Sequence, residues 1–593
     1  MKTPLIRLGA TLGIAVAAIA ASAGTNTWTG GDNQWVDANW NTGQKPGVDD
    51  IAYFEDLPNF ESNWRQGKTF AIFNQGEERL SGFHFANKYG IKIQASVVQI
   101  DGRYVGYPFH FASIFAKDHV AGDGDVIIVT NSIVNAGCYL ASTNSTAYVG
   151  SNHVVLVGCS LSQDNQGTWL TKKGAGTMLM QINDIYNSTG ITGGYRIEEG
   201  TVVRGPAGSP QIGGALVVGG KGQPASFRMQ TSNNANNNTI SPASEIDIRP
   251  LGSVEFEDSY KYCYLEYLSI DHGFFNAGTK SFNMSQQAST ERNTEYVFNG
   301  GTFTNGTLIW IWGGDFTIVA ADVPSVLHGT LEEWAGALIN VPDGTAAVDF
   351  VLDGRWGGGN RQYGKTGAGT MLFINRDPYT LYGIGKDFKI EGGTFILQSE
   401  TNVGLGTNNI VVSAGATFGG TGYQVGGIDP AQSIRGLRGN IILNGTSGNC
   451  ATIKPGTMNY ETGAFLSGTF RIGSETQTNN VISSGYAELR CHIDRTGASC
   501  LAVNGLLQTS ATDALAIVTP EKIPTGVHTL VTFSNGIVNP FETVTINGVD
   551  IASAPGTLAY LDAAGNRIVS FPYYSAGSVV YTKNRDATVI MMR

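Results

Sequence analysis

Short apolar runs alternate with polar turns along most of the chain. β-Branched residues cluster at 126–130, 154–157, 245–248, 348–352, 410–412 and 441–443, and Gly, Asn, Asp or Ser bound each cluster. β-Branched side chains favour extended backbone, whereas the bounding residues favour turns. Only 331–339 has the spacing of a short helix. The pattern therefore predicts an all-β protein.

An internal duplication narrows the architecture. The hexapeptide GAGTML at 174–179 returns at 367–372, and IEEGTV at 197–202 returns as IEGGTF at 390–395. Both pairs are 193 residues apart, and a constant offset indicates a repeated module. Six glycines define the repeat and are expected at strand ends, where side chains would crowd the stack: Gly174, Gly176, Gly200, Gly367, Gly369 and Gly393.

The repeated segments resemble the autotransporter-associated β-strand repeat, in which a G-x-G-T-L-x-L strand, a loop and an x-x-G-T-L strand follow one another. The opening from Trp28 to Phe54 resembles the W-x-G-G…W…A-N-W…P-G…D-x-A-x-F start of many secreted bacterial proteins of this kind, and 503–531 resembles their closing strands. The resemblance implies a right-handed parallel β-helix passenger and no particular activity. We expect no C-terminal translocator barrel, because few residues follow the second repeat.

Elementary packing favours the same fold. With 79 Gly among 593 residues and 14% charged residues, the chain can satisfy its backbone by stacking each coil on the last. We expect a parallel β-solenoid with capping strands and with lateral loops at 57–118 and 260–294; tandem β-sandwich domains are the alternative. The expected segments are a signal peptide (1–23), a Trp-rich cap (24–56), a first β-helical region (57–165), two modules with one repeat copy each (166–353 and 354–505) and closing strands (506–593).

The N-terminus has the pattern of an export signal. Lys2 and Arg7 precede an apolar stretch at 8–20, and 21–23 (ASA) has the small residues of a cleavage site. Cleavage there would leave Gly24 as the first residue of a protein located outside the cell or on its outer surface; an uncleaved membrane anchor is the alternative. No later stretch has 18 apolar residues in a row, so we expect no transmembrane segment in the mature chain.

Export would make the six cysteines candidates for disulfides. Cys491 and Cys500 flank a turn-like stretch at 494–497, so a hairpin would bring them together, and Cys138 and Cys159 are about one coil apart. The alternative is that all six are buried thiols that act as small hydrophobic residues.

The tryptophans have two interpretations. We expect Trp28, Trp35 and Trp40 to cover the open end of the solenoid core, where uncovered strands would invite aggregation. Stacking on sugar rings is the alternative. Trp310 and Trp312 occupy alternate positions and would share one face of a strand, which is a second candidate for a sugar-binding surface.

Charge and motifs exclude several functions. The net charge of -11 argues against nucleic-acid binding. The eight histidines are dispersed, and neither a G-x-S-x-G elbow nor a P-loop occurs, so we assign no catalytic, cofactor-binding or metal-binding residue and no cofactor. The acidic pairs that could serve glycoside chemistry are interpreted first as solvated or turn-forming residues: Glu332-Glu333 beside Trp334, Asp349 with Asp353, and Asp271 beside His272.

These observations favour a structural or adhesive surface protein without catalytic activity. The expected partners are further copies of the chain, joined end to end, or a surface polysaccharide. A β-helix lyase or glycoside hydrolase that acts on polysaccharides is one alternative, and a carbohydrate-binding surface protein is another.

Overall fold

The computed structural model of this protein describes 24–583 apart from short gaps. Within this part of the chain, parallel strands stack into a β-solenoid of about 15 turns, and 3% of the chain is helical. The predicted parallel all-β solenoid is confirmed, and the β-sandwich alternative is wrong because the stacked strands pair in parallel. The expected signal peptide lies outside the described residues. The gaps are at 31–32, 67, 96, 101–102, 107, 119–127, 135–137, 159–160, 181–190, 206–213, 231–238, 241–244, 257–261, 264–265, 279–282, 285–294, 311–314, 334–335, 359–361, 377–385, 400–408, 423–438, 474–477, 496, 520–521 and 554–555.

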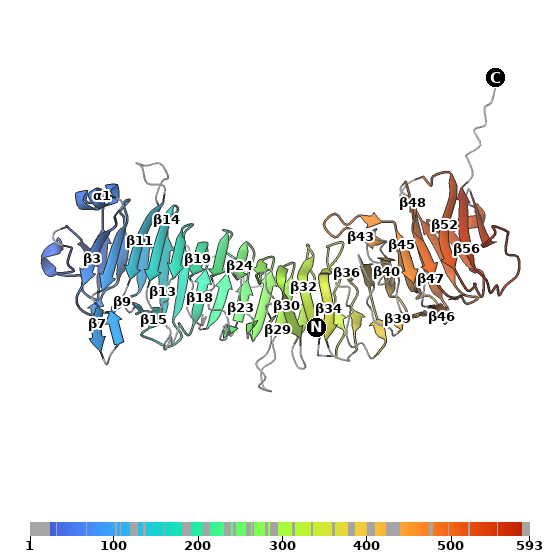
Figure 1. Ribbon diagram of the computed structural model, residues 1–593, viewed down its shortest axis with the longest axis horizontal. Helices are drawn as coiled ribbons and strands as arrows, with labels where there is room; N and C mark the ends of the chain where they lie inside the picture. Colours follow the sequence, from blue (N-terminus) through green and yellow to red (C-terminus); the bar gives the residue numbers. More distant parts are fainter. Residues whose placement is uncertain are drawn as a thin grey trace, which may run out of the picture. The chain divides into compact units, whose positions relative to one another are not determined.

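The chain divides into two compact units, which meet in the sequence between 246 and 261. Unit 1 contains three parallel ladders (Figure 1). Its first ladder consists of β1 (Gly24–Thr27), β2 (Asp50–Phe54), β5 (Gly82–Phe85), β10 (Ser113–Ala116), β13 (Asn144–Val149), β16 (Trp169–Lys173), β18 (Gly194–Ile197) and β20 (Ala215–Val218). The second consists of β3 (Phe70–Asn74), β6 (Ile91–Ala95), β11 (Val129–Val134), β14 (His153–Gly158), β17 (Thr177–Met180), β19 (Gly200–Arg204), β21 (Ala225–Met229) and β24 (Gly252–Phe256). The third consists of β4 (Glu78–Arg79), β9 (Phe109–Phe111), β12 (Cys138–Leu140) and β15 (Leu161–Gln163).

The strands of unit 1 alternate between inward and outward side chains. In β14, Val155 and Val157 are fully buried while Val154 and Leu156 are half-buried on the outer side. This two-residue period is that of a strand with one face on a core. The core of the solenoid is therefore the space enclosed by the ladders.

The expected loop region at 57–118 is wrong in most of its length. It holds β3 to β6, β9 and β10, all ladder strands, whereas only helix α1 (Pro58–Arg65) and the antiparallel hairpin of β7 (Val97–Ile100) and β8 (Arg103–Gly106) depart from the ladders. Phenylalanine fills many of the inward positions of these strands, among them Phe83 and Phe85, and isoleucine fills others, such as Ile72. In α1, Phe60 packs on Phe70 of β3, with ring centroids 5.1 Å apart.

Unit 2 is likewise built of stacked strands, which fall in four main ladders (Figure 1). One consists of β26 (Tyr267–Asp271), β29 (Glu295–Asn299) and β31 (Phe316–Ile318). The longest consists of β27 (Phe274–Asn276), β30 (Thr302–Trp310), β32 (Ser325–Glu333), β34 (Phe350–Gly358), β36 (Thr370–Asn375), β38 (Thr394–Ser399), β40 (Thr417–Gly422), β42 (Ala451–Pro455), β47 (Ala487–Asp494), β51 (Ala514–Val518) and β53 (Thr543–Ile546). A third consists of β33 (Ile339–Asn340), β35 (Gly364–Thr366), β37 (Phe388–Ile390), β39 (Ile410–Ser413), β41 (Ile441–Asn444), β46 (Val481–Ser483) and β50 (Leu507–Gln508).

The fourth ladder of unit 2 ends the described chain with antiparallel strands. It runs β45 (Thr469–Ile472), β49 (Cys500–Val503), β52 (Gly526–Phe533), β56 (Gly577–Lys583) and β55 (Thr557–Asp562), and the last two pairings are antiparallel. Strand β54 (Val549–Asp550) likewise pairs antiparallel with β53.

Two further expectations are corrected in unit 2. The prediction of a short helix at 331–339 is wrong where the structure describes these residues, because β32 continues to Glu333 and β33 begins at Ile339. The expected loops at 260–294 include the ladder strands β26 and β27.

A hairpin from the solenoid covers part of the outer face of unit 2. We call 457–466 the strap; it comprises β43 (Thr457–Met458) and β44 (Phe465–Leu466), which pair antiparallel. Met458 and Tyr460 of the strap pack against a cluster of buried apolar residues, most of which lie in register on successive turns. These residues are Val326, Val348, Val351, Leu372, Ile374 and Ile396.

Candidate functional site

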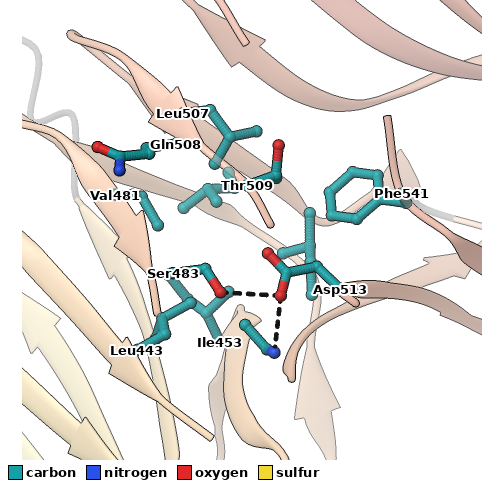
Figure 2. Close-up of a pocket in the computed structure, with 12 residues that line it drawn as sticks. Leu443, Ile453, Val481, Ser483, Leu507, Gln508, Thr509, Asp513 and Phe541 are labelled. Atoms are coloured by element: carbon teal, nitrogen blue, oxygen red, sulfur yellow. Dashed lines mark hydrogen bonds between the residues drawn. The ribbon is translucent and has the colours of Figure 1, made fainter. Parts of the chain in front are cut away.

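A small cavity lies between the inner faces of the C-terminal turns of unit 2 (Figure 2). Its volume of about 20 Å³ has room for roughly one water molecule, far below the roughly 300 Å³ at which small-molecule sites begin. One oxygen of the buried Asp513 carboxylate accepts hydrogen bonds from the Ser483 hydroxyl at 2.8 Å and the Ala487 amide at 2.9 Å. The cavity is thus a gap in the core that a turn-forming aspartate lines, and we assign it no ligand.

The two residues of the predicted pair, Asp349 and Asp353, have different hydrogen-bond partners. The carboxylate of Asp349 accepts the amides of Gly344 and Thr370, each at 2.7 Å, and so fixes a turn at the start of β34. Asp353 instead receives a hydrogen bond from His328 Nδ1 at 2.9 Å on the outer face and is paired with Arg376. Of the other predicted group, Glu332 is half-buried, whereas Trp334 lies outside the described residues, as does the side chain of Glu333.

Charge around Asp353 holds this carboxyl ionised. Burial alone would raise its pKa, but the hydrogen bonds and positive charges of His328 and Arg376 together lower it below the usual value. A carboxylate held in this state stabilises its partners and is a poor proton donor, so this group lacks the raised-pKa acid that glycoside hydrolysis requires.

The predicted pair Asp271 and His272 forms a clasp that also includes Asp322. His272 Nδ1 lies 2.7 Å from Asp271 Oδ1, and Nε2 lies 2.8 Å from Asp322 Oδ1. Hydrogen bonds to Asp322 and Asp271 raise the pKa of His272 above its ordinary value. Asn299 donates to the same Asp271 oxygen at 2.7 Å, so the clasp joins neighbouring turns at the surface.

The structure buries all three N-terminal tryptophans. Trp28, Trp35 and Trp40 are at most 2% exposed, with centroid distances of 5.2 Å between Trp28 and Trp40 and 4.8 Å between Trp35 and Trp40. Trp35 also packs on Phe83 and Phe109 of the following turns. No face of these indoles is open to a sugar. Trp312 and the side chain of Trp310 lie outside the described residues.

The expected disulfide between Cys491 and Cys500 is not formed, since both are free thiols. The second expected disulfide involves Cys159, which lies outside the described residues. The predicted hairpin exists, since Asp494 pairs with Gly497. From Cys500 onward, however, strand β49 pairs with β45 and not with β47. Cys491 Sγ instead donates a hydrogen bond to the Leu530 carbonyl at 3.7 Å inside the core.

The two repeat copies have the same strands in the same register. Thr177 pairs with Thr201 in the first copy, and Thr370 pairs with Thr394 in the second. The repeat glycines lie at the turns of both copies. Gly174 and Gly367 have φ of +75° and +83°, and a Cβ on either would lie 2.5 and 2.4 Å from a carbonyl oxygen of the preceding turn.

Each copy also encloses a lysine that the sequence analysis missed. Lys172 Nζ donates to the carbonyls of Lys173, Gly174 and Glu199 at 3.0, 2.5 and 3.1 Å. Lys365 Nζ donates to the carbonyls of Thr366, Gly367 and Gly392 at 3.3, 2.8 and 2.8 Å. We call each arrangement a lysine cage. The signal was present in the sequence, because a lysine stands two residues before the first glycine of both copies.

Burial governs the charge of the caged lysines. Their exposed fractions are 1% for Lys172 and 0% for Lys365. Burial lowers the pKa of Lys172 to about 7 against a smaller opposing effect of Glu199, and it lowers the pKa of Lys365 to about 8 against Asp349 and Asp343. All three donors of each ammonium have a carbonyl partner, so the cages join turns and present no reactive amine to the surface.

A row of aromatic side chains on the outer face of unit 1 is the strongest candidate for a functional surface. Tyr53, His84, Phe115 and Tyr148 occupy equivalent positions on β2, β5, β10 and β13. Successive ring centroids are 4.5, 4.5 and 4.8 Å apart, with interplanar angles of 80°, 63° and 12°. We call these four residues the aromatic ladder. Phe115 is 39% exposed and the other three are half-buried.

The sequence contained a signal for the aromatic ladder. Each member stands between two inward-facing apolar residues, as Phe115 does between Ile114 and Ala116. The four positions recur at intervals of 31, 31 and 33 residues. Insertions such as α1 and the β7–β8 hairpin lengthen these intervals beyond one simple coil, so the period is hard to recognise in the sequence.

Neither comparison with known proteins assigns the chain to a family: no protein-family model and no curated protein matches it. Within the described residues, no three His, Cys, Asp or Glu side chains are placed to hold a metal ion. In the same part of the chain, every helix is too short or too polar to cross a membrane.

Proposed function

We propose that this chain is an exported, non-catalytic β-solenoid that serves as a structural or adhesive element outside a bacterial cell, like proteins with autotransporter-associated β-strand repeats. The observation that carries the proposal is the in-register stacking of parallel strands, which turns single outward residues into continuous surface rows. Rows of this kind suit extended contact with another surface better than chemistry at one point.

The state of the acidic groups supports the non-catalytic part of the proposal. Asp349 accepts turn amides, Asp353 is engaged by His328 and Arg376, and Asp271 by His272 and Asn299. Glycoside chemistry needs two facing carboxyls, one of which keeps a raised pKa. The lowered pKa of Asp353 is the opposite of that requirement.

The N-terminal pattern supports the proposed location. A basic start, an apolar stretch at 8–20 and small residues at 21–23 are typical of a cleaved signal peptide. The mature chain would then begin at Gly24, which is also the first residue of β1.

Expression of the full chain in a secreting bacterium tests these points together. We expect the exported protein to begin at Gly24 by N-terminal sequencing, to promote adhesion of coated beads to bacterial cells, and to release no new reducing ends from a panel of polysaccharides. Turnover of a polysaccharide that Asp353→Asn abolishes would contradict the non-catalytic function, and retention of Met1 in exported protein would contradict cleavage.

A further inference from the structure

Beside the aromatic ladder, the same outer face carries two hydroxyl groups. The residues two positions before the four rings are Ile51, Gly82, Ser113 and Thr146, which are in register with one another. We call Ser113 and Thr146, which supply the hydroxyls, the hydroxyl shelf. Asp118 lies on the other side of the aromatic ladder, beyond the ends of β10 and β13, where its carboxylate accepts hydrogen bonds from the Tyr148 hydroxyl at 3.1 Å and the Ser151 amide at 2.8 Å.

This surface has the two properties that a sugar chain requires. A pyranose ring has apolar C–H faces, which pack on aromatic rings because the ring face is electron-rich, and a rim of hydroxyl groups, which needs polar partners. The aromatic ladder supplies the rings, and Ser113, Thr146 and Asp118 supply the polar partners. Rings on four successive turns suit a ligand that repeats along its length.

The area of the aromatic ladder is too small for a protein partner. A fully exposed aromatic side chain offers about 150–250 Å². With Phe115 at 39% exposure and the other rings half-buried, the four together offer at most on the order of 300 Å². A stable protein interface needs about 800 Å² on each partner. A thin linear ligand fits this strip, and a second copy of the chain does not.

Positive charge is not in excess around the aromatic ladder, because Glu55 and Asp118 lie beside its first and last rings. Lys173, which continues the row after Tyr148, lies 3.7 Å from Glu198 and is thereby neutralised. Burial and the nearby Lys117 lower the pKa of His84 to about 4, so this ring is uncharged at neutral pH. The strip therefore offers no excess of positive charge to an acidic polymer.

We propose that the aromatic ladder and its hydroxyl shelf bind a neutral polysaccharide chain that lies across successive turns of unit 1. This inference rests on the adhesive function proposed above and names the partner of that function. The rings of Phe115 and His84, at the centre of the ladder, make the main contacts.

Binding isotherms of the full chain on insoluble neutral polysaccharides test the inference, with cellulose, chitin, mannan and β-1,3-glucan as probes and polygalacturonate as the acidic contrast. We expect binding to at least one neutral polymer. His84→Ala/Phe115→Ala should weaken it about tenfold, equivalent to about 1.4 kcal/mol, whereas Phe115→Tyr, which keeps the ring, should bind like the wild type. Val217→Ala, an outward substitution on β20 of the same sheet, is the matched control.

Folding of each variant is checked by circular dichroism and thermal unfolding. Equal binding by the double variant and the wild type would overturn the inference, as would binding to polygalacturonate alone. Light scattering that shows a dimer abolished by the double variant would also overturn it, in favour of a second copy. Adhesion of beads to cells that survives the double variant would overturn the inference and leave the adhesive function standing. A wild type that adheres to no cell and degrades a polymer would overturn the function itself.

Discussion

At Gly174 the backbone leaves no space for a side chain. Its φ is +75°, and a Cβ would lie 2.5 Å from the Val149 carbonyl oxygen of the turn before. Gly222 has the same φ of +75°, but no atom within 4 Å of the place where its Cβ would be. The two positions therefore separate the cost of backbone conformation from the cost of crowding between turns.

We expect Gly174→Ala to lower the free energy of unfolding by about 3 kcal/mol, because left-handed backbone costs roughly 1–2 kcal/mol and overpacking adds roughly 1–3 kcal/mol. Gly222→Ala should cost only about 1 kcal/mol. Urea unfolding followed by circular dichroism measures both. Equal losses at the two positions would show that crowding between turns does not contribute.

The lysine cages make stability depend on pH in a defined direction. The pKa of Lys172 is lowered to about 7 and that of Lys365 to about 8, whereas both return to about 10.5 in the unfolded chain. Between these values the unfolded chain binds protons that the folded chain does not. Stability should therefore rise with pH through this window, by at most about 1.4 kcal/mol per pH unit for each lysine.

Urea unfolding of the wild type and Lys365→Met between pH 6 and 10 measures this contribution. We expect the variant to be less stable at pH 9, because buried carbonyls lose the N–H donors that the neutral amine still provides, and to have a shallower rise of stability with pH. Lys173→Met, which changes a half-buried lysine next to the first cage, should keep the slope of the wild type. An unchanged slope in Lys365→Met would contradict the titration of this cage.

Among the elements, the strap is held to the solenoid at both of its strands. Met458 and Tyr460 pack on the outer apolar cluster, and Phe465 stacks on His492 with ring centroids 4.0 Å apart. Lys454 Nζ lies 4.5 Å from the centre of the Phe465 ring. The strap thus covers apolar area that would otherwise face water.

We expect Met458→Ser/Tyr460→Ser to uncover the apolar cluster without unfolding the solenoid. Hydrogen exchange should speed up in β34, β36 and β38 next to the strap, and binding of a hydrophobic dye should increase, because the cluster loses its cover. Glu461→Ala, a change at the exposed tip, is the control. Unchanged exchange in the double variant would mean that the strap does not protect these strands.

Residue patterns predicted some elements and concealed others, for physical reasons. Alternation and turn residues predicted the all-β class, and the repeated motifs 193 residues apart predicted matching strands in the two copies. Both signals are visible within short stretches of sequence. The lysine cages and the pairing of Asp353 with His328 depend on which residues lie one turn apart. That spacing changes whenever a turn carries an insertion such as α1. The pairing of β49 with β45 is likewise set by tertiary packing rather than by local sequence. The hairpin at 494–497 could therefore be predicted, whereas the free thiols of Cys491 and Cys500 could not.

For the molecule as a whole, the segment 41–44, which covers the free edge of β1, affects whether copies of the chain associate. Thr27 of β1 donates its amide to Asn41 Oδ1 at 2.8 Å and accepts from the Asn41 amide at 2.9 Å. Asn26 Nδ2 donates to the Gln44 carbonyl at 2.7 Å. Asn41 thereby occupies the backbone groups of Thr27 that an open strand edge would offer to another chain, and the Asn26 side chain helps to hold 41–44 in place.

We expect the mature chain to be monomeric by light scattering, because the cover competes with any second copy for the edge of β1. Asn26→Ala/Asn41→Ala should loosen the cover and produce larger species as concentration rises. Thr143→Ala, an exposed change elsewhere in unit 1, should remain monomeric. End-to-end filaments of the wild type would contradict this prediction and favour self-association as the working state.

The lysine cages also decide where this chain can be cut and rejoined. Each ammonium takes two acceptors from the bend that follows its own strand and one from the next turn, as Lys172 does with Glu199. A splice that adds or removes complete turns would leave every ammonium with three acceptors. A splice between the two turns that form one cage would leave the buried ammonium with fewer than three carbonyl acceptors. Whole turns are therefore the modules by which this scaffold can be lengthened, shortened or recombined.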